Sequence, residues 1–122
     1  MKIAMRYEYL AEFEKDLKRL SKRFRSLPED LETLKKVLAI SPSASPPISF
    51  SVSNLNARHE IIKIKKFACK ALKGSGGNAG IRIIYAFHKE EQKIVFIEIY
   101  FKGDKVNEDR SRVLKYYSVP PK

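Results

Sequence analysis

The alternation of hydrophobic and polar residues predicts a short strand followed by an amphipathic helix at the start of the chain. In residues 2–7, the side chains of Ile3, Met5 and Tyr7 lie on one side of an extended chain, as in a strand. Apolar residues then recur at spacings of three and four, as on one face of a helix that ends near Arg25. These residues are Leu10, Phe13, Leu17, Leu20 and Phe24.

A second helix is predicted directly after the first. Residues 26–29 have the S-x-x-E pattern of a capping box, with a proline that the first turn of a helix tolerates. Leucines lie along one face of this helix, which is expected to end near Ile40, and they are Leu27, Leu31, Leu34 and Leu38. Two such helices joined by a short connection predict an αα-hairpin.

Residues 41–59 are rich in serine and proline and have no sustained hydrophobic period. They predict an exposed connection. The alternation of Ile48, Phe50 and Val52 makes a short strand an alternative for these residues. Three segments with strand character follow, at residues 61–69, 80–87 and 93–102. The alternation in the first of them falters at Lys66, where a β-bulge is an alternative.

A last helix is expected after a polar turn, with Asn107 as its N-cap and with Glu108 and Asp109 complementing its N-terminal dipole. The order of elements is then β-α-α-β-β-β(-α). This order predicts an α+β protein in which a helical hairpin packs on one face of an antiparallel sheet. Residues 1–122 contain no internal repeat and are expected to form one domain.

The side-chain alternation divides the predicted sheet into a core face and an open face. The apolar face of the last strand, which the hairpin is expected to cover, consists of Val95, Ile97, Ile99 and Phe101. The better core set of the middle strand is Ile81, Ile83, Tyr85 and Phe87, which leaves Arg82 on the open face. Because same-face residues of neighbouring strands lie close together, the open face is expected to hold Lys63, Lys65, Arg82, Glu98, Tyr100 and Lys102.

Clustered cations beside an aromatic ring suit RNA, because cations bind phosphate oxygens and the ring stacks on a base. The chain contains 25 Lys and Arg residues against 14 Asp and Glu residues, a net charge of +11. Such an excess indicates a polyanionic partner, which is a nucleic acid, an anionic membrane or an acidic protein. The alternative is a solvated sheet face on which Glu98 pairs with Arg82.

Other residue patterns exclude several functions. A single cysteine, Cys69, forms neither an internal disulfide nor a zinc site alone, and its apolar surroundings predict a buried thiol. His59 and His88 lie in a predicted loop and turn, and we expect neither to be catalytic. The glycine-rich turn lacks the GK[ST] of a P-loop, and no apolar run approaches the ~18 residues of a membrane span. We therefore expect a cytoplasmic protein that uses no metal, no small-molecule cofactor and no membrane.

In its order of elements and in several short motifs, the chain resembles the RelE/ParE superfamily of bacterial and archaeal toxins. The matching segments are FEKDLKRLSKRF, KIKKFACKALKG, GIRIIYAF, and KIVFIEIYFKGDK followed by NEDR. The likeness spans nearly the whole chain and is strongest from Lys63 to Asp109. It implies a RelE-like fold and a type II toxin that a cognate antitoxin holds inactive.

For the RelE branch, the resemblance implies metal-independent cleavage of messenger RNA in the A site of the ribosomal 30S subunit. The ribose 2′-hydroxyl attacks the adjacent phosphate, and the resemblance assigns catalytic roles to Lys63, Lys65, Arg82 and Lys102. A lysine among other cations has a lowered pKa and can exchange protons near neutral pH. The residues expected to bind RNA around them are Lys66, Glu98, Tyr100 and Lys105.

Two positions depart from the RelE-like pattern. The residue after Lys102, often arginine in such proteins, is Gly103, and the tyrosine that many of them carry falls near Asp109. No acid for the leaving group is identified, which favours the alternative of an inactivated relative that binds RNA or antitoxin. A second alternative is a ParE-like inhibitor of DNA gyrase, although gyrase inhibitors of this fold generally lack the basic cluster.

Overall fold

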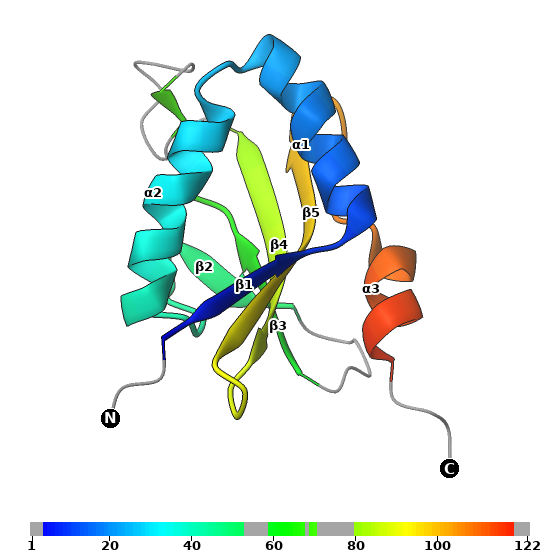
Figure 1. The fold of residues 1–122 in the computed structure, drawn as a ribbon. Helices are drawn as coiled ribbons and strands as arrows, with labels where there is room; N and C mark the ends of the chain where they lie inside the picture. Colours follow the sequence, from blue (N-terminus) through cyan, green and yellow to red (C-terminus); the bar gives the residue numbers. More distant parts are fainter. Residues whose placement is uncertain (1–3, 53–58, 68, 71–79, 119–122) are drawn as a thin grey trace.

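A mixed sheet and three helices make up the described part of the computed structural model, which comprises residues 4–52, 59–67, 69–70 and 80–118 (Figure 1). The helices are α1 (Ala11–Arg23), α2 (Leu27–Ile40) and α3 (Arg110–Tyr117). The strands are β1 (Arg6–Tyr9), β2 (Ser49–Ser51), β3 (Glu60–Ile64), β4 (Ile81–His88) and β5 (Lys93–Phe101). Their order in the sheet is β1-β5-β4-β3-β2. Strands β2 to β5 are antiparallel neighbours, and β1 joins β5 in parallel.

The helical hairpin of α1 and α2 packs on one face of this sheet, as the sequence predicts (Figure 1). Both stripes of apolar side chains supply the core, although Leu10, Leu17 and Leu34 are only half-buried. The buried helical residues are Phe13, Leu20, Phe24, Leu27, Leu31 and Leu38. They meet buried strand residues that include Ile62, Ile64, Ile81, Ile83, Tyr85, Phe87, Ile94, Phe96 and Ile99. The α+β class is therefore confirmed.

The capping interactions at two helix starts differ from those predicted. The S-x-x-E segment forms no capping box, because Ser26 has helical backbone angles (φ −80°, ψ −7°) and its hydroxyl donates to the Asp30 carboxylate at 2.7 Å. The N-cap of α3 is Asp109 and not Asn107, which lies two residues too early. The Asp109 carboxylate accepts a hydrogen bond of 3.0 Å from the backbone N–H of Arg112, the position that an N-cap side chain reaches.

Strand boundaries also shift. Strand β1 starts at Arg6, since its backbone N–H donates to Gln92 just before β5 begins (3.0 Å), whereas residues 1–3 lie outside the described part. The short strand considered as an alternative within residues 41–59 is present as β2, the edge strand beside β3. The predicted strand at residues 61–69 is wrong beyond Ile64. There the backbone N–H groups of Lys65 and Lys66 both donate to Ile48, at 2.9 and 3.2 Å, and the ladder ends.

A β-bulge interrupts the ladder between β4 and β5. Ile84 pairs with Glu98, but the next residue, Tyr85, pairs with Phe96. Ile97 is therefore an extra residue on β5, opposite no partner of its own. Successive side chains of a strand point to opposite faces of the sheet. One extra residue therefore moves the side chains that precede it in the strand to the other face.

The bulge makes part of the predicted core face wrong. Ile99 and Phe101 face the hairpin as predicted, and Phe96 faces it too, although strict alternation along the strand places Phe96 on the opposite face. Val95 and Ile97 instead lie on the opposite face, in a second apolar cluster. This cluster joins α3 to the sheet through Val113 and Tyr117, and its strand residues are Ile61, Ile84, Ala86, Val95, Ile97 and Tyr100. The face predicted to be open is thus partly covered by α3.

Packing against Phe101 explains why position 103 is a glycine. A Cβ atom at this position would lie 2.4 Å from Cε2 of the Phe101 ring, far inside van der Waals contact. The ring has little freedom to move, because the Phe24 ring is 5.1 Å away between centroids and the Arg23 guanidinium is 4.7 Å from the ring centroid. A residue larger than glycine would not fit this arrangement.

Gly103→Ala is expected to lower the free energy of unfolding by about 1–3 kcal/mol, the usual effect of overpacking. In a Phe101→Leu background the same substitution should have a clearly smaller effect, since the shorter side chain leaves room. Urea denaturation of the wild type, both single variants and the double variant measures this coupling. An equal effect in the two backgrounds would show that the ring is not the obstacle.

Candidate nucleic-acid interface

Three strand ends bring four cations to one end of the sheet. Strand β3 ends where β4 begins and β5 ends, since Ile81 pairs with Phe101 and Ile83 with Ile64. The backbone N–H of Lys102 donates to the Gly80 carbonyl at 2.7 Å, which closes this end. We call these four cations the basic sheet end, and they are Lys65, Lys66, Arg82 and Lys102.

The basic sheet end is open to solvent. Lys65, Lys66 and Lys102 are exposed and Arg82 is half-buried. The Arg82 guanidinium donates to the Lys65 carbonyl at 2.8 Å, and the Lys65 ammonium lies 4.8 Å from the centroid of the Phe50 ring. None of the four side chains forms an ion pair with a carboxylate of the described residues. Their positive charge is therefore available to an anionic ligand.

The structure separates Lys63 from the basic sheet end. Its ammonium forms an ion pair with Glu108 at 2.8 Å, and the two side chains are only 14% and 8% exposed. Burial alone would lower the pKa of Lys63, but the hydrogen bond to Glu108 and the nearby Tyr100 outweigh it and raise that pKa. The expectation of a lysine with a lowered pKa is therefore wrong for Lys63, because a carboxylate faces it.

Glu98 is the most enclosed charged group of the site, at 1% exposure. Its carboxylate accepts a hydrogen bond from the Lys105 ammonium and another, of 2.7 Å, from the backbone N–H of Asp109. Arg82 is not its partner, so the alternative in which Glu98 pairs with Arg82 is wrong. The partners come instead from the segment between β5 and α3. Alternation along the strands does not predict contacts with a segment outside the strands.

Tyr100 lies beneath two lysines. The Lys63 and Lys105 ammonium groups are 5.9 and 5.3 Å from its ring centroid, and the residue is 3% exposed. The ring is therefore not accessible to a base in this arrangement. The Tyr100 hydroxyl is buried and makes no hydrogen bond with a described residue. We call Lys63, Glu98 and Tyr100 the covered site.

Polar contacts on both sides hold α3 over the covered site. The Arg112 guanidinium donates to Asp16 of α1 at 2.7 Å and to the carbonyl of Ile97 at 2.9 Å. The Tyr116 hydroxyl donates to the exposed Glu12 carboxylate at 2.8 Å. Arg112 and Asp16 are 96 residues apart, so nothing in the local sequence predicts this attachment.

At the other end of β4, the rings of His59 and His88 stack with centroids 3.8 Å apart. His88 Nε2 lies 2.8 Å from the Tyr117 hydroxyl, and burial lowers the pKa of His88. This cluster is remote from the basic sheet end, since His88 pairs with Lys93 at the opposite end of β5. Cys69 is buried, as predicted.

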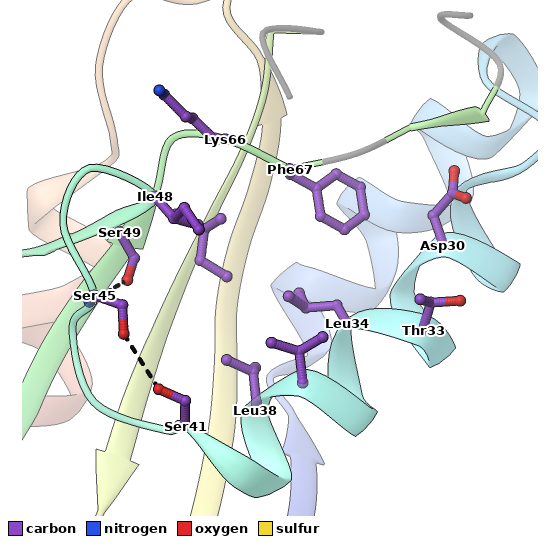
Figure 2. Close-up of a pocket in the computed structure, with 12 residues that line it drawn as sticks. Asp30, Thr33, Leu34, Leu38, Ser41, Ser45, Ile48, Ser49, Lys66 and Phe67 are labelled. Carbon is purple, nitrogen blue, oxygen red and sulfur yellow. Dashed lines mark hydrogen bonds between the residues drawn. The ribbon is translucent and has the colours of Figure 1, made fainter. Parts of the chain in front are cut away.

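An apolar groove of about 440 Å³ runs between α2 and the edge of the sheet. Figure 2 shows Leu34 and Leu38 of α2 on one wall and Ile48 and Phe67 on the other. Lys66 lies at its rim, so the groove adjoins the basic sheet end. The described residues contain no helix able to span a membrane and no group of three side chains suited to a metal ion.

Comparisons with known proteins define the class of fold. No protein-family model matches the chain, and no curated protein matches it. Among solved structures, it is similar to an arginine-to-alanine double mutant of the toxin RelE from E. coli in the free state, with a TM-score of 0.60. The likeness covers 93% of this chain and 98% of that chain at 18% sequence identity. The predicted RelE-like fold is thereby confirmed.

The ion pair between Lys63 and Glu108 predicts how stability depends on pH. Burial alone would raise the pKa of Glu108, but its hydrogen bonds and the charges of Lys63 and Arg110 together outweigh burial and lower that pKa from its ordinary 4.5. The stabilisation is therefore present above pH 4.5 and lost as pH falls through the lower folded-state pKa. We expect the free energy of unfolding of Glu108→Gln to fall less steeply below pH 4.5 than that of the wild type. Parallel curves from urea denaturation would contradict the pairing.

Proposed function

We propose that this chain is a RelE-like toxin of a type II toxin–antitoxin system that cleaves messenger RNA on the ribosome. The observation that supports the proposal most is the basic sheet end, four cations without a described carboxylate partner on a RelE-like fold. Phosphate groups match such a cluster, because Lys and Arg form charge-assisted hydrogen bonds with their oxygens. The site of action would be the cytoplasm, where messenger RNA is translated.

In the proposed reaction the ribose 2′-hydroxyl attacks the adjacent phosphorus, and the bond from phosphorus to the 5′-oxygen breaks. The products would be a 2′,3′-cyclic phosphate and a 5′-hydroxyl end, with one proton lost and one gained. Arg82 stays protonated and would stabilise the charge on the phosphate oxygens. Lys65 is exposed and would assist the attacking hydroxyl. Lys63 holds its proton firmly, so it suits charge stabilisation and not proton abstraction.

The contacts of the covered site favour a second candidate, a relative that binds RNA without cutting it. Glu108 pairs with Lys63, and Glu98 pairs with Lys105, so two of the predicted cations are neutralised within the chain. The basic sheet end would still bind phosphates in such a protein. The two candidates differ only in whether the bound RNA is cleaved.

A cognate antitoxin is the expected protein partner. The apolar groove beside α2 and the basic sheet end share Lys66, which lines the groove. A segment with both apolar and acidic side chains would therefore contact both surfaces at once. Such a segment would also cover cations that RNA needs.

Expression of the wild type in growing cells is expected to arrest translation, and Arg82→Ala should relieve the arrest. Loss of one preorganised cation typically lowers the rate of such chemistry about 100-fold or more. Mapping the 5′ ends of messenger RNA after induction measures cleavage directly. Arg6→Ala is the matched control, since Arg6 is exposed near the opposite end of β5. Unchanged 5′ ends with the wild type would refute the ribonuclease and leave the binding-only candidate.

RNA affinity is expected to fall steeply with salt, by about 0.7 logarithmic units per decade of salt for each phosphate contact on a single strand. The double variant Lys65→Ala/Lys102→Ala should reduce this slope by about 1.4. Fluorescence anisotropy with a labelled single-stranded RNA at several salt concentrations measures the slope. An Arg6→Ala variant should keep the wild-type slope. A double variant with an unchanged slope would show that RNA binds elsewhere.

A further inference from the structure

We propose that Glu108 is a built-in competitor of the RNA phosphate, whose carboxylate occupies an anion subsite on Lys63 and keeps the covered site closed. Substrate would open the site by replacing this carboxylate with a phosphate. The inference rests on the proposed function in one respect, namely that the anion is a phosphate of RNA. It adds a contact within the chain that regulates access to the site.

The geometry of Glu108 is that of an anion bound between cations. One carboxylate oxygen lies 2.8 Å from the Lys63 ammonium, and the other lies 3.4 Å from Nε of Arg110. A phosphate oxygen accepts charge-assisted hydrogen bonds at about 2.7–2.9 Å, which is the distance seen here for Lys63, and the Arg110 guanidinium adds a second positive charge nearby. The subsite is therefore already formed, and an anion of the chain fills it.

The subsite has one donor that the carboxylate leaves unused. The Tyr100 hydroxyl is buried beside Lys63 and has no hydrogen-bond partner among the described residues. A buried polar group without a partner is uncommon in folded proteins, and this one is free to bond with an oxygen of a ligand on Lys63. A carboxylate has two oxygens, whereas a phosphate in RNA has two free oxygens and two bridging ones. A phosphate could therefore engage Tyr100 in addition to Lys63.

Glu108 is also placed where it can leave without unfolding the protein. It precedes the N-cap of α3, and residues 102–107 before it are all exposed. The contacts of Arg112 with Asp16 and Ile97 hold α3 independently of Glu108. Segments with few buried contacts open at low free energy. The carboxylate can thus swing away while α3 stays attached.

The exchange is favoured because the subsite would not be left empty. A buried ion pair contributes little net stability, since desolvation of both charges offsets their attraction. Removal of one partner alone is strongly unfavourable, because it leaves a buried charge without compensation. Replacement of one anion by another avoids that penalty. The strength of the competition then depends on the phosphate concentration and on the strength of the contacts of Glu108 with Lys63 and Arg110.

Glu108→Gln is expected to bind RNA about 3–10 times more tightly than the wild type, because the competing charge is gone. The probe is a labelled single-stranded 2′-O-methyl RNA, which cannot be cleaved, followed by fluorescence anisotropy. The matched control is Glu90→Gln, which makes the same change in net charge at an exposed position in the β4–β5 hairpin turn. A gain confined to Glu108→Gln supports the inference. An equal gain in both variants, or no gain in either, would overturn it.

Two further measurements cover the cases in which this comparison fails. If Glu108→Gln does not fold, Glu108→Asp keeps the net charge but shortens the reach to Lys63, and it should bind the RNA more tightly than the wild type. If no form of the protein binds RNA, the proposed function fails, and inorganic phosphate becomes the probe. The Lys63 ammonium signal in NMR should then shift at lower phosphate concentration in the variant. Identical titrations would overturn the inference.

Discussion

The buried carboxylate of Glu98 organises the face of the sheet opposite the hairpin. A charge that is 1% exposed must have hydrogen-bond partners, since burial of an unpaired charge is strongly unfavourable. Lys105 and the backbone N–H of Asp109 supply them, and both belong to the segment between β5 and α3. Because Asp109 is also the N-cap of α3, this one carboxylate fixes where the helix begins and which residues it covers.

The bulge in β5 provides the surface on which α3 rests. Because Ile97 is an extra residue, Val95 and Ile97 lie on the same face as Tyr100 and form an apolar floor for the helix. The freed carbonyl of Ile97 accepts a hydrogen bond from Arg112, so the irregular point of the strand also holds α3 by a polar contact. Bulges commonly serve to redirect side chains beside functional sites. Here the bulge brings a helix to the edge of the basic sheet end.

Local hydrophobic periodicity is sufficient to predict the helices and strands that are regular along their length. The leucine stripe predicts α2 to its last residue, and the alternation in β4 correctly places Arg82 away from the hairpin. The predictions fail where structure depends on pairs of distant segments. A bulge is a property of two strands together, and the partner of Lys63 lies 45 residues further along the chain. The pKa of Lys63 was expected to fall because only neighbouring cations were visible, whereas the structure adds Glu108.

In the proposed function, this arrangement would separate the binding of RNA from its cleavage. Exposed cations of the basic sheet end can attract a polyanion from solution, because their fields are not screened by nearby carboxylates. Lys63 and Tyr100 would contribute only after Glu108 and Lys105 have moved, since these two side chains lie against them. An anion held first at the surface would raise the local phosphate concentration beside Glu108. If one anion replaced another on Lys63, opening of the covered site would leave no buried charge unpaired, and the basic sheet end would hold the incoming phosphate close to Lys63.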